Sequence, residues 1–128
     1  MTKLIIDVAN EKIFLMFINE DNIHKVEHEN SKINYEKLSI LINEFLDKQK
    51  KDLVDISQIY VNRGPGSFAG IRNSLSTVKA INFVNNTDYF CFSFNDFKKG
   101  DDVKYENIPD LCKKYMIKKN LINPDYSG

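Results

Sequence analysis

The sequence contains no tryptophan, only two cysteines and three prolines, and its formal net charge is zero over 128 residues. Cys91 and Cys112 supply neither a disulfide framework nor the paired spacing of a zinc site, so we expect reduced thiols in a cytoplasmic protein. The balanced charge disfavours a domain that captures nucleic acid or an acidic membrane through its own electrostatic field.

Long apolar runs are also missing. The longest, at residues 13–18, is far shorter than the roughly 20 residues that cross a bilayer. Met1-Thr2-Lys3 leads directly into a strand-like run, without the pattern of a signal peptide. A chain of this length can still bury roughly two-thirds of its unfolded surface in one core. We therefore expect a soluble, intracellular protein with no membrane contact.

Apolar runs separated by turn residues predict an α/β fold. Strands are expected at residues 4–8, 13–18, 23–28, 56–61 and 89–94, and helices at residues 34–50 and 67–84. The first strand is apolar on both faces, as in the centre of a sheet, whereas the third is more polar and is expected near an edge. The order β-β-β-α-β-α-β predicts a mixed five-stranded sheet with helices packed on it.

The composition changes after the fifth strand. Residues 98–102 are typical of an exposed linker, and one short helix follows with Pro109 at its first position. The last six residues are turn-like. We therefore divide the chain into a lobe at residues 1–97 and a linker with a short helical tail at residues 98–128.

The junction between the fourth strand and the second long helix has the most distinctive sequence, Arg63-Gly64-Pro65-Gly66-Ser67-Phe68-Ala69-Gly70-Ile71-Arg72. Ser67 is a good N-cap, and the glycines allow backbone angles that are closed to other residues. The loop could bind an anion at the helix start with Arg63 as a donor, or it could be a tight turn. It lacks both the Walker ending and the three-glycine dinucleotide pattern, which favours the turn. Arg63 is then expected to be an exposed cation with little effect on stability.

Other candidate sites are weaker. Asp7 could hold a metal at the end of the first strand, but Val8 and Ala9 offer no hydroxyl group to assist, so a cap of the following turn is favoured. His24 and His28 share one side of a strand without a third ligand, so solvent-facing histidines are favoured over a zinc site. No nucleophile–base pair emerges, and we predict no catalytic residue, no metal and no cofactor.

The second long helix presents small residues outside its predicted core stripe. That core stripe consists of Phe68, Ile71, Leu75 and Val78. Small side chains let another backbone approach, and Ile40 on the first helix faces away from that helix's apolar side. These features predict a helical surface that meets a partner. The predicted interface consists of Ile40, Ala69, Asn73, Ser74, Ser76, Thr77, Ala80 and Ile81.

The junction closely resembles the Gly-Pro-Gly-Ser-Phe-Thr-Gly-Leu-Arg signature of the TsaB family, also called YeaZ. Leu4-Ile5-Ile6-Asp7 looks like the first strand of that family, and the resemblance covers roughly residues 1–97. It implies a lobe of the actin-like ATPase, or RNase H-like, fold. The chain departs from the family at Val8 and Ala9, where Thr-Ser is usual, and at Ala69, where the motif has threonine. Most of the family's second lobe is also missing.

The resemblance implies an accessory role rather than an enzyme. TsaB supports TsaD in forming N6-threonylcarbamoyladenosine at position 37 of transfer RNA. The implied partners are a TsaD-like subunit bound through helices 34–50 and 67–84, a TsaE-like ATPase, and tRNA only through the complex. A homodimer is expected when the chain is alone. Two alternatives stay open: a minimal nucleotide-binding enzyme that uses Asp7 and the loop 64–66, and a homodimeric interaction module unrelated to tRNA modification.

Overall fold

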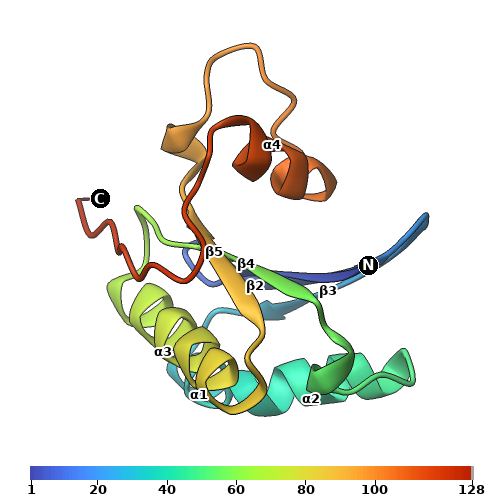
Figure 1. Ribbon diagram of the computed structural model, residues 1–128. Helices are drawn as coiled ribbons and strands as arrows, with labels where there is room; N and C mark the ends of the chain where they lie inside the picture. Colours follow the sequence, from blue (N-terminus) through green and yellow to red (C-terminus); the bar gives the residue numbers. More distant parts are fainter. Residues whose placement is uncertain (128) are drawn as a thin grey trace.

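The computed structural model describes residues 1–127 (Figure 1). The strands are β1 (Thr2–Asp7), β2 (Lys12–Asn19), β3 (Asn22–Glu29), β4 (Gln58–Asn62) and β5 (Asp88–Phe92). The helices are α1 (Lys32–Glu36), α2 (Leu38–Lys48), α3 (Phe68–Asn85) and α4 (Ile108–Lys114). Three short 3-10 turns are η1 (Leu53–Asp55), η2 (Phe94–Asp96) and η3 (Tyr105–Asn107). This order confirms the predicted α/β fold.

The five strands form one mixed sheet in the order β3-β2-β1-β4-β5. β1 pairs antiparallel with β2 and parallel with β4, while β5 extends the parallel half and β3 the antiparallel half. The central place of β1 follows from Leu4, Ile5 and Ile6, which are buried on both faces of the sheet. The predicted edge position of the polar strand β3 is also confirmed.

The predicted helix at residues 34–50 is divided in two. Ser31 caps α1 by accepting a hydrogen bond from the Asn34 backbone N–H, and the helical geometry is interrupted at Lys37. α1 buries no residue, whereas α2 buries five, including Leu41 and Phe45. The interruption therefore separates a surface turn from the helix that packs on the sheet.

Two layers cover the sheet, with α1, α2 and α3 on one face and η3 and α4 on the other (Figure 1). The core under α1–α3 is mainly aliphatic, with strand residues such as Leu4 and Val61 packed against Ile42 and Ile71. The core on the other face is rich in aromatic rings and includes Phe14, Tyr60, Phe92 and Phe97. Among helices within residues 1–127, none has both the length and the apolar character that a membrane span needs.

The segment after α4 runs back along β5 and reaches the start of α3 (Figure 1). The Asn120 backbone N–H donates to the Tyr89 carbonyl at 2.7 Å, and the Tyr89 N–H donates to Asn120 Oδ1 at 2.9 Å. Further on, the Asp125 N–H donates to the Arg63 carbonyl at 2.7 Å. The predicted tail is thus held against the outer edge of β5 and against the junction.

Candidate partner-binding site

The strand-to-helix junction forms as predicted. Ser67 is the N-cap of α3, and its Oγ accepts a hydrogen bond from the Gly70 N–H at 3.1 Å. At the end of β4, Asn62 Oδ1 accepts from the Gly64 N–H at 2.9 Å. The peptide bond between Gly64 and Pro65 is cis. The turn and the first helical residues are therefore fixed by hydrogen bonds within the junction itself.

The glycines of this motif admit the backbone of other segments. A Cβ atom would lie 2.2 Å from the Ala9 carbonyl oxygen if placed on Gly66 and 2.1 Å from the Val8 carbonyl oxygen if placed on Gly70. On Gly64 it would lie 2.1 Å from the Asp125 carbonyl oxygen. The β1–β2 turn and the tail thus occupy the space that a side chain would need.

This packing bears on the anion-binding interpretation. An anion site at a helix start uses free N–H groups, but the Ser67 N–H donates to the Ala9 carbonyl at 2.8 Å and the Gly70 N–H to Ser67 Oγ. Carbonyl oxygens at Val8 and Ala9 also place negative partial charge against the loop. The geometry favours the tight turn, and we describe residues 63–70 below as the packing junction.

The two arginines have different environments. The expectation that Arg63 is an exposed cation is wrong: only 16% of its side chain is accessible, and its Nη2 lies 2.8 Å from Asp96 Oδ1. Its Nη1 also donates to the Asn123 carbonyl at 3.3 Å. Arg72 is exposed and forms no ion pair within the part of the chain that the structure describes. Arg63 is therefore structural, whereas Arg72 is free to meet another molecule.

Asp7 caps the turn after β1, in keeping with the interpretation that the sequence favoured. It is fully buried, and its Oδ1 accepts from the Ala9 N–H at 3.0 Å. Its Oδ2 accepts from Tyr105 Oη at 2.6 Å and from Asn62 Nδ2 at 3.1 Å. Burial, followed by the charge of Asp7, raises the pKa of the Tyr105 phenol, which stays protonated and continues to donate. The carboxylate is satisfied internally, which disfavours the alternative of a nucleotide-binding enzyme built on Asp7.

Sequence reasoning did not identify Tyr105 as the partner of Asp7. The two residues are 98 positions apart, and the local pattern around Tyr105 indicates only a turn before a helix. Phe14, which stacks on the Tyr105 ring with centroids 4.0 Å apart, helps to hold the phenol over the end of β1. No short motif would have predicted this contact.

The remaining reactive side chains offer no chemical centre. His24 is exposed on β3 as predicted, and its ring lies 6.4 Å from that of Phe17, whereas His28 is half-buried. Burial raises the pKa of Cys91 to about 11 and that of Cys112 to about 12, so both thiols are protonated and poor nucleophiles near neutral pH. No cluster of three potential metal-ligating His, Cys, Asp or Glu side chains occurs within residues 1–127.

A groove runs along the outer side of α3, between this helix and the segment formed by α1, α2 and η1. It consists of two adjoining hollows of about 350 and 430 Å³ that share Asn73 and Ser76. Tyr35 on α1 borders the first hollow, and Ser39 and Leu53 border the second. We call this feature the helical groove.

Most of the predicted interface residues lie in the helical groove. Those on α3 that line it are Ala69, Asn73, Ser76, Thr77, Ala80 and Ile81. Ile81 lies at the bottom of the groove and belongs to the core, with only 7% of its surface accessible, so its prediction as an interface residue is wrong. Ile40 lies on α2 with 52% of its surface exposed. Ser74 does not belong to this surface: it is fully buried, and its hydroxyl donates to the Ile71 carbonyl at 2.9 Å. The reason is that Ser74 lies on the side of α3 that faces the sheet, where its small size suits close packing.

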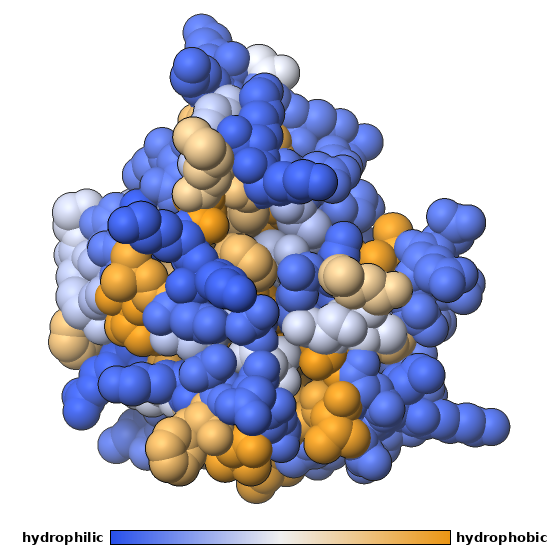
Figure 2. Space-filling view, viewed as in Figure 1, coloured by the Kyte–Doolittle hydropathy of each residue, from blue (hydrophilic) through white to orange (hydrophobic). Residues whose placement is uncertain are grey.

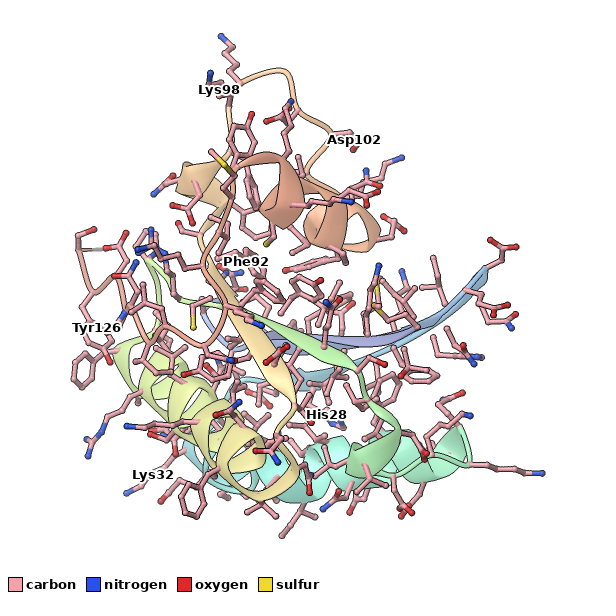
Figure 3. All side chains as sticks on the ribbon, viewed as in Figure 1. His28, Lys32, Phe92, Lys98, Asp102 and Tyr126 are labelled. Atoms are coloured by element: carbon pink, nitrogen blue, oxygen red, sulfur yellow. The ribbon has the colours of Figure 1, made fainter. Side chains whose placement is uncertain are left out.

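The predicted position of Phe68 in the core is also wrong. The sequence placed it in the core stripe of the helix, but it is 58% exposed, lines the helical groove and contacts the Tyr126 ring at 4.6 Å between centroids. Figure 3 shows Tyr126 beside the start of α3. The other predicted stripe residues, Ile71, Leu75 and Val78, are buried as expected. As the first residue of α3, Phe68 precedes the part of the helix that lies on the sheet.

Several exposed apolar side chains next to the groove were not predicted. Phe83 is 86% exposed and Val84 74% exposed at the end of α3, and Val54 in η1 is 74% exposed. Figure 2 shows hydrophobic surface along the lower part of the view, where α2 and α3 lie. The adjacent pair Phe83 and Val84, outside the core stripe, was the signal that the sequence offered. Large apolar groups this accessible on one layer are typical of an interaction surface.

Known structures share this fold. YeaZ from Pseudomonas aeruginosa matches with a TM-score of 0.66 and 22% identity, over 72% of this chain and 43% of that chain. A structure described as an uncharacterized protein with similarity to peptidase YEAZ, from the same species, gives the same values. T. thermophilus RuvC in complex with a Holliday junction substrate matches with a TM-score of 0.55 and 12% identity, over 98% of this chain and 85% of that chain. No protein-family model and no curated protein sequence matches the chain.

These matches concern the fold. The chain has the TsaB-like fold that its junction motif predicted, and this fold is of the RNase H-like and actin-like ATPase type. It spans less than half the length of the YeaZ chain that it matches.

Proposed function

We propose that this chain is a TsaB-like accessory subunit that binds a TsaD-like partner through the helical groove. In this role it supports the formation of N6-threonylcarbamoyladenosine at position 37 of tRNA and performs no chemistry itself. The observation that carries the proposal is the groove of small residues, bordered by exposed apolar side chains, on the helical layer of a YeaZ-like fold.

The shape of the groove suits a helix from a partner. Packed helices have axes 8–10 Å apart, and small side chains at the contact favour the shorter distances. Ala69, Ser76 and Ala80 provide such side chains along α3. Exposed side chains such as Phe83 and Val84 would then lose water contact, which contributes about 25 cal/mol for each Å² of apolar surface buried.

The non-catalytic part of the proposal is supported by the state of the polar groups. Asp7 is fully hydrogen-bonded, and carbonyl oxygens from the β1–β2 turn pack against the loop where a phosphate would bind. Catalysis would belong to the partner, and tRNA would be met only in the complex, with a TsaE-like ATPase as a further component. We also propose that a second copy of the chain occupies the groove when the partner is absent, in a cytoplasmic homodimer.

The test is co-expression of this chain with the TsaD homologue of its source organism. We expect a stable complex by light scattering and tRNA threonylcarbamoylation that depends on the chain. Ala80→Glu and Thr77→Arg place a charge in the groove and are expected to abolish association without changing the melting temperature appreciably.

Lys99→Glu is the matched control, since it introduces a carboxylate on the opposite layer and should leave the complex intact. An unchanged complex mass for both groove variants would show that the assigned face is wrong. If the wild-type chain forms no complex and the modification does not depend on it, the accessory role itself is wrong.

A further inference from the structure

The helical layer has an uneven distribution of charge. Residues 56–87 contain no aspartate or glutamate and three cations, Arg63, Arg72 and Lys79. Arg63 is paired with Asp96 inside the molecule. Arg72 and Lys79 are exposed on α3, and neither forms an ion pair within residues 1–127. α3 is therefore a helix of 18 residues whose only charges are two positive, unpaired side chains.

These two cations lie on the same side of α3. They are seven residues apart, which is close to two turns of helix and about 10.5 Å along the axis. At 100° per residue they fall within an arc of about 60° that also contains Phe68 and Phe83. Arg72 and Phe68 line the helical groove, so this arc forms its outer edge. The small residues Ser76 and Ala80 lie beside that edge and line the groove.

We propose that the surface seated in the helical groove is a helix carrying two carboxylates, about two turns apart, that pair with Arg72 and Lys79. Its small or aliphatic residues would face Ser76 and Ala80, between the two aromatic side chains of the edge. This inference rests on the proposed function and specifies the chemistry of the partner.

The dimensions of the groove agree with a helical occupant. From Phe68 to Asn85 the lining of α3 extends over 18 residues, or about 25 Å, which corresponds to between four and five turns of a second helix. Exposed apolar groups along the groove need a partner with an apolar face of its own. A nucleic acid is disfavoured because the free cations at the groove are few, with Lys32 on α1 added to Arg72 and Lys79. Glu36 also lines the groove, and the net charge of the chain is zero.

Charge also distinguishes a foreign helix from α3 of a second copy. In a packing of α3 against α3, Arg72 and Lys79 would face cations of the same kind, because this helix has no carboxylate. Like charges across an interface are unfavourable, so the pairing of two copies that we propose in the absence of the partner is weakened by this repulsion. A partner helix with carboxylates at the matching spacing would remove that repulsion and replace the second copy.

The experiment measures the association rate of the chain with the TsaD homologue at ionic strengths of about 0.01 M and 0.15 M, where the Debye length is roughly 30 and 8 Å. The variant Arg72→Glu/Lys79→Glu is compared with Lys98→Glu/Lys99→Glu, which changes the net charge by the same amount on the opposite layer. Figure 3 shows Lys98 far from α3. We expect the first variant to associate about tenfold more slowly at low salt, with a smaller difference at high salt, and the control to stay within about twofold of the wild type.

Other results would contradict the inference in recognisable ways. If the complex forms and both double variants associate like the wild type, the carboxylate pairing is wrong while the accessory role stands. If Arg72→Gln/Lys79→Gln only accelerates dissociation, equally at both salt concentrations, the two side chains act by packing rather than by charge. The chain alone can also be tested for binding of total tRNA. If the wild type binds tRNA and the Arg72→Glu/Lys79→Glu variant does not, the ligand of the two cations is a nucleic acid and not a helix. Absence of any complex would overturn the inference and the accessory role together.

Discussion

The two layers that cover the sheet are attached to it by different means. The helical layer is held by a continuous aliphatic core and by backbone contacts too close for a side chain, such as Gly70 against Val8. The opposite layer is held by aromatic rings and by the hydrogen bond from Tyr105 in η3 to Asp7 at the end of β1. Arg63 connects the packing junction at the helical layer to Asp96 in η2.

This difference explains how one small fold can present an apolar surface and remain intact. α3 buries Ile71, Leu75 and Val78 against the sheet, so its position does not depend on what covers its outer side. The opposite layer packs most of its apolar residues inward, on Tyr60, Phe92 and their neighbours, and it shows mainly hydrophilic surface at the top of Figure 2. Met116, just after α4, is an exception and is 84% exposed. The helical layer therefore carries the surface that we propose for a partner, and the opposite layer covers the other face of the sheet.

The largest expected effect on stability comes from Gly70→Ala. In an ordinary helix this change would stabilise by roughly 1 kcal/mol. Here the new Cβ would lie 2.1 Å from the Val8 carbonyl oxygen, so the helix start and the β1–β2 turn must separate. We expect the free energy of unfolding to fall by on the order of 3 kcal/mol, measured by urea denaturation.

Gly100→Ala is the matched control in the opposite layer. Gly100 has a φ of +101°, but a Cβ added there would meet no atom within 4 Å, so only backbone strain opposes the substitution. A loss of about 1 kcal/mol is expected there. A Gly70→Ala variant as stable as the wild type would show that the helical layer is not anchored by this close approach.

Arg63→Ala tests the connection between the layers and should have the next largest effect. The substitution removes a charge-assisted hydrogen bond and leaves Asp96, four-fifths buried, without its cation. We expect a loss of about 2 kcal/mol in the free energy of unfolding. Arg72→Ala serves as the control because Arg72 is exposed and unpaired within residues 1–127, and little change is expected. Equal effects of the two substitutions would mean that Arg63 does not link the layers.

Local pattern was sufficient for the five strands, for the second long helix and for one edge of the sheet, but not for the division of the first helix. The apolar faces of β1 predicted its central place, and the polarity of β3 predicted its edge position. Ser67 caps α3 as predicted, whereas Pro109 is the second residue of α4 rather than the first. A partner-facing surface on α3 was predicted because small residues recur along this helix at helical spacing, and it stays a prediction. Helical spacing alone could not tell which small residue faces the sheet, and for that reason Ser74 was misplaced.

The contacts that connect the layers could not be predicted in the same way. Arg63 meets Asp96 across 33 positions, and Asp7 meets Tyr105 across 98. Such pairs depend on how the chain after β5 returns over the sheet, and no local periodicity encodes that path. Arg63 was predicted to be exposed because the sequence of the junction does not show that the tail folds over it.

The smallest effect expected concerns acid pH and should be confined to the opposite layer. Hydrogen bonds from Lys114 Nζ at 2.8 Å and Tyr115 Oη at 2.5 Å lower the pKa of Asp101 from 3.8 to about 2. Because the folded pKa is the lower one, the stabilisation is complete above the ordinary pKa and disappears as the pH falls from about 4 to about 2. An NMR titration of the Asp101 carboxyl should show this midpoint, and Lys114→Met should move it toward 3.8.

Hydrogen exchange over this pH range, corrected for intrinsic rates, should rise around α4 but not in α3. An Asp101 titration midpoint near 3.8 in the wild type would contradict the prediction. Hydrogen exchange that rises in α3 as much as around α4 would also show that acid does not act on the opposite layer alone.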